Sequence, residues 1–159
     1  MKIRVRKAER GDANTLMTLI SALANYEKLD PPTLEAQGRL IQDGWPQDGN
    51  ARFASWLAEA VDPSNGSTSA VGYAITFFTY SSFLARPTLY IEDIFILPER
   101  RRDGVGTALF TALMDEARRQ QCGRIEWVVL DWNTSAQQFY RKLGATHMTD
   151  WQCYRMSLG

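Results

Sequence analysis

The sequence predicts a single domain of the α/β class, in which a mixed β-sheet carries helices on both faces. Segments with the alternation of strands and segments with helical periodicity follow one another along the whole chain. No linker, repeat or low-complexity tract divides the 159 residues. Hydrophobic residues make up 45% of the chain and charged residues 23%, which is typical of a globular protein with one sizeable core. We therefore expect one domain over residues 1–159.

The N-terminal half is predicted to contain a strand, two helices and an antiparallel pair of strands. Residues 3–7 alternate as a short strand does. Asp12 is a candidate N-cap for a first helix, and the break at residues 31–33 is expected to end that helix and cap a second one. Residues 53–61 and 70–80 suit two strands joined by a polar turn. The apolar anchors are Leu16, Leu19, Ile20 and Leu23 in the first helix and Leu34, Leu40 and Ile41 in the second.

The C-terminal half is predicted to continue with alternating strands and helices. Residues 89–97 form a near-continuous apolar run, as expected of a central strand covered on both faces. A short helix near the end is expected to stop at Gly144. The expected elements are a strand over 89–97, a helix over 105–117, a strand over 125–130, a helix over 136–143 and a last strand over 151–157.

Composition argues against several classes of protein. Lys and Arg number 18 and Asp and Glu also 18, whereas a dedicated nucleic-acid binder usually has a basic excess. The chain lacks the ~20 consecutive apolar residues of a membrane helix, and its start lacks the core of a signal peptide. A single histidine, His147, argues against a zinc site or a His-dependent triad. We interpret Cys122 and Cys153 as reduced thiols of a cytoplasmic protein, although the sequence leaves a disulfide between them open.

The junction over residues 98–107 is the first feature with chemical potential. Gly104 and Gly106 open a helix directly after a buried strand, where backbone N–H groups and the helix dipole can bind a phosphate or pyrophosphate. The arginine run over residues 100–102 adds positive charge. The turn lacks the third glycine of a dinucleotide-binding motif and the ending of a Walker loop. A solvated basic turn, or a small nucleic-acid patch, is the alternative interpretation.

Two further features are polar residues within elements predicted to be buried: an acidic pair in the central strand and polar residues of the last helix. Glu92 and Asp93 should point to opposite faces of the central strand unless a bulge intervenes. A buried carboxylate is then paired, shifted in pKa or functional; alternatively the sheet splays and both acids reach water. Asn133 or Thr134 can cap the last helix. Tyr140 lies on the inner face of that helix, where a core position is the alternative to a catalytic one.

Taken together, these segments resemble the GNAT superfamily of N-acetyltransferases. Residues 101–106 fit the signature R/Q-x-x-G-x-G/A, and Asn133 with residues 139–145 resembles the second signature. The resemblance covers essentially the whole chain and implies a mostly antiparallel mixed sheet of six to seven strands, with helices on both faces. It is sharpest to the diamine acetyltransferase group, and within it to the thialysine-type branch. The segments that carry this closer similarity are 24–29, 43–44, 78–80, 89–94 and 129–133.

The resemblance implies acetyl-CoA as cofactor and assigns residues to a site. Tyr140 matches the tyrosine that protonates the departing thiolate, and Glu92 the carboxylate that takes the proton of the amine, through water. The implied cofactor-binding residues are Ile94, Phe95, Ile96, Arg101, Arg102, Asp103, Gly104, Val105, Gly106, Thr107, Asn133, Thr134, Ser135, Ala136, Tyr140 and Lys142. The implied amine-binding residues are Tyr26, Glu27, Glu92, Asp93, Glu126, Trp127 and Val128, and no metal is expected.

The chemistry accounts for these residue types. An alkylamine with a pKa of about 10 is protonated at neutral pH, so carboxylates attract it and one of them can act as general base. The amine then attacks directly, and no cysteine needs a role. Polyamine enzymes of the group carry an acidic residue and a tryptophan where this chain has Ser81, Ser82 and Phe83, which favours a shorter amine.

We therefore predict a cytoplasmic, homodimeric enzyme that moves an acetyl group from acetyl-CoA to the primary amine of a small molecule. A lysine-like or thialysine-like amino acid, or a short di- or polyamine, is the expected acceptor. No nucleic acid or membrane is expected as a partner. The alternatives are a protein or peptide N-acetyltransferase and a non-catalytic acyl-CoA-binding sensor of amines.

Overall fold

The computed structural model describes residues 2–158 and divides them into two compact units, one ending at Trp127 and the other beginning at Val128. The first unit contains β1 (Lys2–Lys7), η1 (Arg10–Asp12), α1 (Ala13–Glu27), α2 (Leu34–Gly44), β2 (Ala54–Val61), β3 (Thr68–Ser81), β4 (Arg86–Ile96), η2 (Pro98–Arg100), α3 (Val105–Arg119) and β5 (Arg124–Trp127). The second unit contains α4 (Thr134–Lys142). Among the described residues, no helix has the length and apolar character needed to cross a membrane.

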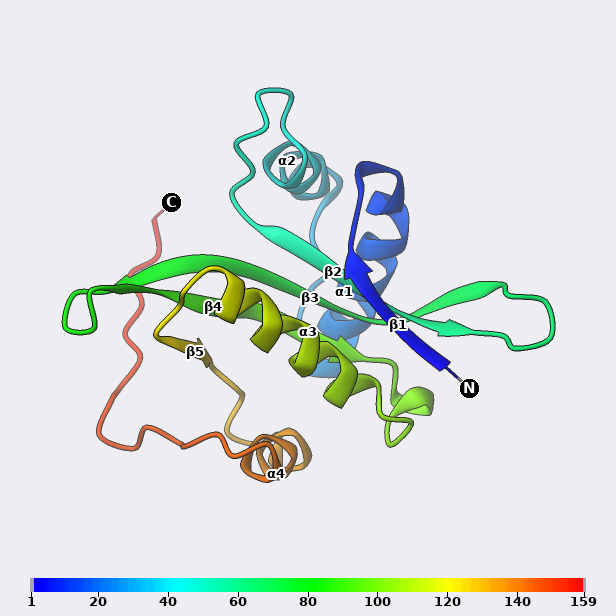
Figure 1. The fold of residues 1–159 in the computed structure, drawn as a ribbon. Coiled ribbons are helices and arrows are strands. Elements are labelled where there is room, and N and C mark those ends of the chain that lie inside the picture. The colour runs from blue at the N-terminus through cyan, green and yellow to red at the C-terminus, as the bar shows by residue number, and fades with distance from the viewer. Residues whose placement is uncertain (1, 159) are drawn as a thin grey trace. The chain divides into compact units, whose positions relative to one another are not determined.

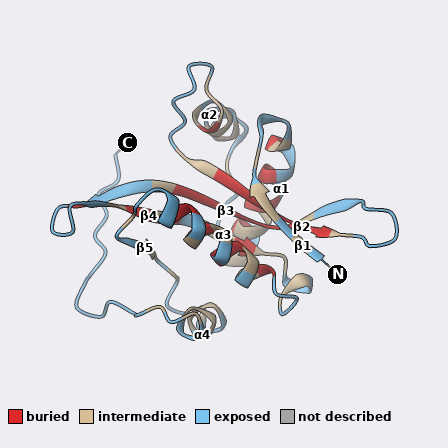
Figure 2. Cartoon of the chain, viewed as in Figure 1, coloured by how far each residue is buried: buried red, intermediate tan, exposed pale blue. Residues whose placement is uncertain are grey.

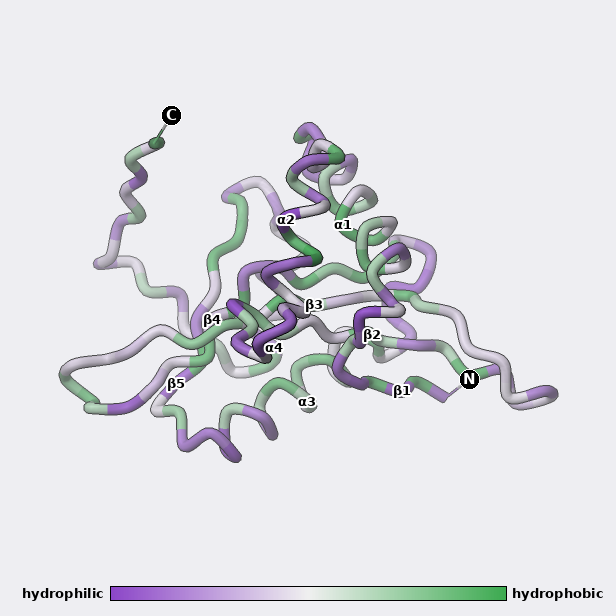
Figure 3. The backbone as a smooth tube through the Cα atoms, turned by 90° about the horizontal axis from the view of Figure 1, so that it is seen from above, coloured by the Kyte–Doolittle hydropathy of each residue, from purple (hydrophilic) through white to green (hydrophobic). Residues whose placement is uncertain are grey.

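The first unit is built on one mixed sheet whose strands follow each other in chain order, β1-β2-β3-β4-β5 (Figure 1). The first four strands pair antiparallel, and β5 pairs parallel with β4. Helices α1 and α2 lie on one face of this sheet and α3 on the other, as the view from above also shows (Figure 3). The mixed sheet with helices on both faces is confirmed.

The core explains why the central strands are apolar on both faces. On one face α1 buries Leu16, Leu19 and Ile20 against Leu57, Tyr73, Ile75 and Phe95 of the sheet. On the other face α3 buries Val105, Leu109 and Leu113 almost completely. The buried residues therefore run along β2, β3, α1 and α3 (Figure 2). Each fully buried aliphatic side chain stabilises the fold by about 1.5–3 kcal/mol.

One glycine sets how closely β3 and β4 approach. Gly72 pairs with Ile96, and a Cβ atom at Gly72 would lie 2.8 Å from the backbone oxygen of Phe95. Only a residue without a side chain fits at this contact. The contact fixes the register of the two strands that carry the candidate site.

A network of charges ties β1 to β2. Glu59 is buried on β2 and accepts hydrogen bonds from Arg4 and Arg6 of β1. Arg6 also donates two hydrogen bonds to Asp12, which holds the pKa of that carboxyl down at about 2. Burial acts to raise the pKa of Glu59, but the hydrogen bonds of both arginines outweigh it and the pKa is lowered. These acids therefore stabilise the fold at neutral pH, and that stability is lost as the pH falls through their lowered pKa values.

The helix ends correct three details of the sequence prediction. Asp12 occupies the N-cap position of α1, but its side chain binds Arg6 and the Glu9 amide and does not cap the helix. Helix α1 ends before the proline break, because Lys28 adopts a left-handed conformation with φ of 59°. Leu34 was expected to be an anchor of α2, yet this first residue of the helix is 86% exposed. Thr33 caps α2 as predicted, accepting a hydrogen bond from the Ala36 amide.

The strand count is lower than predicted, at five among the described residues. The strand expected over residues 125–130 ends at Trp127, because its ladder with β4 stops at the Ile91–Trp127 pair, immediately before an irregularity in β4. The last strand expected over 151–157 is wrong: this segment has no regular structure and its side chains are exposed. Without a neighbouring strand to pair with, apolar alternation does not form a stable strand.

Candidate active site

A β-bulge in β4 separates the two neighbouring carboxylates. Asp93 pairs with Ile75 and Ile91 pairs with Thr76, so Glu92 is an extra residue with no partner on β3. A bulge re-aims side chains that strict alternation would send to opposite faces. The Glu92 side chain is exposed, whereas Asp93 is half-buried. Each of the two interpretations of this pair therefore fits one residue: Glu92 reaches water, whereas Asp93 is half-buried and accepts a hydrogen bond from Tyr73.

The surroundings of Asp93 disfavour its ionised form, and one hydrogen bond stabilises that form. Burial raises the pKa of Asp93 to about 6, and the negative charges of Glu92 and Glu27 act in the same direction. The hydroxyl of Tyr73 donates a hydrogen bond to Asp93 Oδ2 at 3.1 Å, which opposes this shift of the pKa. Tyr73 itself is fully buried, so its own pKa is raised by burial and by the Asp93 charge. Near neutral pH the phenol stays protonated, and the carboxyl, with a pKa of about 6, is mostly ionised.

The end of α1 brings two more predicted residues to this place. The Tyr26 ring lies 6.1 Å from the Phe95 ring, measured between centroids. Glu27 follows Tyr26 at the last position of α1, and burial raises the pKa of its carboxyl. Glu27 also acts electrostatically on Asp93 and Tyr73. The structure thus brings Tyr26, Glu27 and Asp93 together, and we call Glu27, Glu92 and Asp93 the acidic cluster.

The predicted cofactor turn fits a phosphate group. Gly104 is the N-cap of α3, with φ of 81° and open space where a side chain would begin. Among residues 2–158, no side chain makes a capping hydrogen bond to this helix start. The first N–H groups of α3 and the positive end of its dipole are therefore available to an anion such as the pyrophosphate of coenzyme A. Arg102 and Asp103 are exposed, and Asp103 lies 4.0 Å from Arg100.

Arg101 connects the turn to the acidic side of the site, a contact that the sequence did not predict. Its guanidinium carbon lies 4.3 Å from the centroid of the Tyr26 ring and 5.9 Å from that of Phe95. Its Nε donates a hydrogen bond to the Ile96 carbonyl at 3.3 Å. The side chain therefore packs over aromatic rings beside β4 in a cation–π arrangement. Of the arginine run, Arg101 is thus directed toward the strand.

The remaining amine-site candidates lie on or after β5. Glu126 pairs with Tyr90 of β4 and forms an ion pair of 2.9 Å with Arg124. The Trp127 ring packs against Phe110 of α3, with ring centroids 5.2 Å apart. Val128 belongs to the second unit and is exposed.

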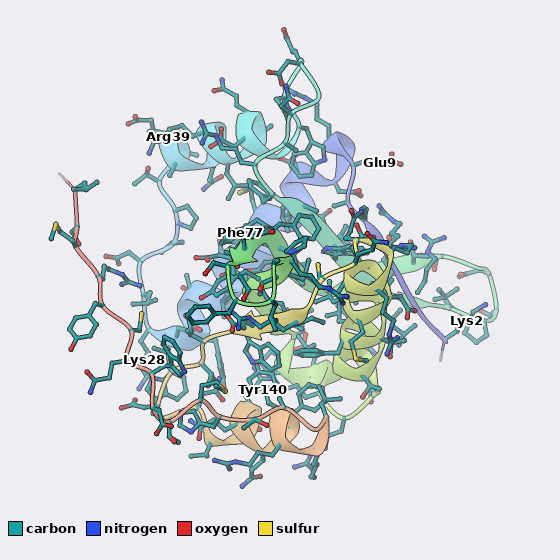
Figure 4. All side chains as sticks on the ribbon, turned by 60° about the vertical axis from the view of Figure 1, so that its left-hand side comes forward. Lys2, Glu9, Lys28, Arg39, Phe77 and Tyr140 are labelled. Carbon is teal, nitrogen blue, oxygen red and sulfur yellow. The ribbon has the colours of Figure 1, made fainter. Side chains whose placement is uncertain are left out.

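The second unit carries the other signature residues. The Asn133 side chain accepts a hydrogen bond from the Ala136 amide at 3.2 Å, so Asn133 rather than Thr134 caps α4. Tyr140 is half-buried on α4 (Figure 4), and its ring lies 5.9 Å from that of Phe139. Lys142 is the last residue of α4 and is exposed.

Tyr73 is the polar residue of this site that sequence reasoning missed. Its neighbours in the chain are Gly72 and Ala74, so a lone tyrosine between small residues was the available signal. The signal is weak, because a strand tyrosine is more often a packing residue. Its partner became visible only through the register of β3 with β4.

Comparison with known proteins identifies the family. A family model described as "Acetyltransferase (GNAT) family" matches residues 20–145. The chain belongs to the GNAT family. It is an acetyl-CoA-dependent N-acetyltransferase, and the predictions of family, fold and cofactor are confirmed.

Two curated relatives show which activities are found among similar proteins. The chain is similar to a "Thialysine N-epsilon-acetyltransferase" of Bos taurus, with 32% identity over 159 residues that cover 96% of this chain and 91% of the relative. It is also similar to "L-ornithine N5-acetyltransferase NATA1" of Arabidopsis thaliana, with 42% identity over 86 residues, or 54% of this chain and 38% of the relative.

A solved structure supports the fold. The structure of AAC(6')-Iy, in complex with a bisubstrate analog containing CoA, has a TM-score of 0.77 and 21% identity to this chain. The similarity covers 99% of this chain and all of that one.

Proposed function

We propose that this enzyme acetylates the primary amine of a small molecule. The observation that carries the proposal is the acidic cluster beside Tyr26, because three neighbouring carboxylates, two of them half-buried, attract a compact cation such as an alkylammonium. The names of the relatives agree with this substrate class, since they refer to the N-epsilon nitrogen of thialysine and the N5 nitrogen of ornithine. A lysine-like or thialysine-like amino acid or a short di- or polyamine is the proposed acceptor.

The proposed roles are those that the family resemblance assigns, and the exposure and pairing of the groups within the first unit support part of them. Glu92, exposed at the bulge, takes a proton from the ammonium through water, and the freed amine attacks. Glu27 and Asp93 hold the cation before this step. Residues 101–107 hold the pyrophosphate at the start of α3, with residues 94–96, residues 133–136 and Lys142 as further cofactor contacts. Bound acetyl-CoA supplies the acetyl group as a thioester, and Tyr140 delivers the proton that the departing sulfur requires.

We further propose one acetyltransferase domain over residues 1–159, acting in the cytoplasm as a homodimer. The family match from residue 20 to residue 145 spans both compact units, which supports a common function for them. Cys122 and Cys153 are free thiols, as is usual for cytoplasmic proteins. Exposed aromatic side chains at the turn between β3 and β4 support a contact with a second copy.

The test is thiol release from acetyl-CoA with a panel of amines: thialysine, lysine, ornithine, putrescine and spermidine. We expect turnover with the amino acids and short diamines. The Tyr140→Phe variant should lower kcat by about 10²–10⁴-fold with little change in the KM of the amine, because only the proton donor is removed. Tight binding of acetyl-CoA without turnover of any amine would instead indicate a sensor. Full kcat in Tyr140→Phe would remove the assignment of Tyr140 as the acid.

A further inference from the structure

The Tyr73 hydroxyl is the polar tip of a side chain placed in the middle of the apolar core. Tyr73 is fully buried among residues of α1 and the sheet, and its ring lies 6.5 Å from that of Phe95. A buried phenol requires a hydrogen-bond acceptor, and Asp93 Oδ2 provides it at 3.1 Å. The close approach of β3 and β4 at Gly72 and the bulge at Glu92 together set this contact.

Three titratable groups act on Asp93, and a cationic side chain, Arg101, lies nearby against Tyr26 and Phe95. Glu92 precedes it on β4, and Tyr73 reaches it from β3. Glu27 acts on it from the end of α1, next to Tyr26. Arg101, from the turn before α3, lies over the Tyr26 and Phe95 rings. Two of these groups repel the charge of Asp93, and Tyr73 donates a hydrogen bond to it.

We infer that Tyr73 is a positioning residue whose hydroxyl holds Asp93 oriented and ionised in the amine site. The inference rests on the proposed function, because it adds to the amine site a residue that does not itself touch the reacting atoms. Tyr73 would thereby set the pH at which this site becomes attractive to an ammonium ion. A tyrosine that served only to fill the core would have no such effect.

The sign of the effect follows from the balance at Asp93. Burial and the neighbouring carboxylates raise the pKa of Asp93 to about 6, and the Tyr73 hydrogen bond acts against them. Removing the hydroxyl therefore raises the pKa of Asp93 further. At pH 6–7 more of the carboxyl is then neutral, and the amine is held less strongly. At pH 8.5–9 the carboxyl is ionised with or without the hydroxyl, while an alkylamine with a pKa of about 10 is still mostly a cation.

The kinetic experiment compares wild type and Tyr73→Phe from pH 6 to pH 9 at saturating acetyl-CoA. We expect the KM of the amine to rise about fivefold in the variant at pH 6 and about twofold at pH 7, with the ratio falling toward about one at pH 9. Tyr80→Phe is the matched control, since Tyr80 is on the same strand but exposed, and its ratio should stay near one throughout. A Tyr73→Phe ratio that does not change with pH would overturn the inference.

A second measurement separates this inference from the proposed function. The carboxyl ¹³C signal of Asp93, assigned with Asp93→Asn, is titrated in the protein without cofactor or amine. We expect its midpoint to move up by about one pH unit in Tyr73→Phe, whether or not any amine is a substrate. An unchanged midpoint would overturn the inference even if the amine panel is acetylated. A shifted midpoint without turnover of the panel would leave Tyr73 in its role and remove the proposed function.

Discussion

At the scale of single residues, the free energy of a carboxylate depends on whether water reaches it. Glu92 and Asp93 show both situations one residue apart, because the bulge in β4 leaves Glu92 exposed and turns Asp93 toward Tyr73. The sequence drew attention to this pair of acids. It could not say which one is buried, since that depends on the register between β3 and β4. Tyr73 was missed for the same reason.

A change at Asp93 should reveal the free energy that this burial costs. The pKa of Asp93 is raised from 3.8 to about 6 in the folded protein, so its contribution to stability is full below pH 3.8 and is lost as the pH rises through about 6. Asp93→Asn should therefore be more stable than wild type at pH 7.5, by about 1–3 kcal/mol, and similar to it near pH 4. Urea unfolding at the two pH values measures this difference.

The control for this change is Glu92→Gln at the neighbouring exposed position. Its effect on stability should stay within about 0.5 kcal/mol at both pH values. An Asp93→Asn variant that is less stable than wild type at pH 7.5 would contradict the raised pKa. Asp93→Asn should also bind the amine more weakly, because the buried charge that destabilises the fold is the charge that attracts the ammonium ion.

At the scale of elements, the start of α3 is the part of the fold most directly shaped for a ligand. Gly104 combines a left-handed φ of 81° with open space beside it and an uncapped helix end. Gly104→Trp should reduce the affinity for coenzyme A at least about tenfold, because an indole would fill the space next to the N–H groups of the helix. Titration calorimetry with coenzyme A measures the loss, and thermal unfolding monitors the strain.

Gly66→Trp provides a matched control on a different element. Gly66 lies in the turn between β2 and β3, with φ of 71° and equally open space. Each variant places a non-glycine residue in the left-handed conformation, which costs about 1–2 kcal/mol. The two variants should therefore lose similar amounts of stability relative to wild type. Only Gly104→Trp should lose coenzyme A. Equal affinities in the two variants would remove the pyrophosphate from this turn.

At the scale of the whole molecule, periodicity and break residues predicted the fold class and the order of the elements from β1 to α4. The buried stripes of α1 and α3 and the apolar run of β4 each followed from local pattern alone. Residues 128–130 and 151–157 show where local pattern fails, because a strand exists only if a neighbour pairs with it. The candidate site also has a part that local pattern predicts and a part that it does not. The glycine turn and the acidic pair are visible in the sequence, whereas the contacts of Tyr73 and Arg101 depend on segments distant in the chain.

The proposed homodimer leads to the last prediction, which concerns the turn joining β3 and β4 at the left of Figure 1. Phe78, Tyr80, Phe83 and Leu84 gather there with large exposed areas, and Phe83 is 99% exposed. Apolar groups gathered in this way mark a contact surface, whereas an isolated exposed residue such as Leu34 does not.

Light scattering after size exclusion should give wild type about twice the mass of the 18.0 kDa chain. Phe83→Ser should shift the protein toward the single-chain mass by weakening association about tenfold or more, and Leu34→Ser should leave the dimer intact. A dimer unaffected by Phe83→Ser would place the interface elsewhere, and a wild-type protein with the mass of one chain would contradict the homodimer.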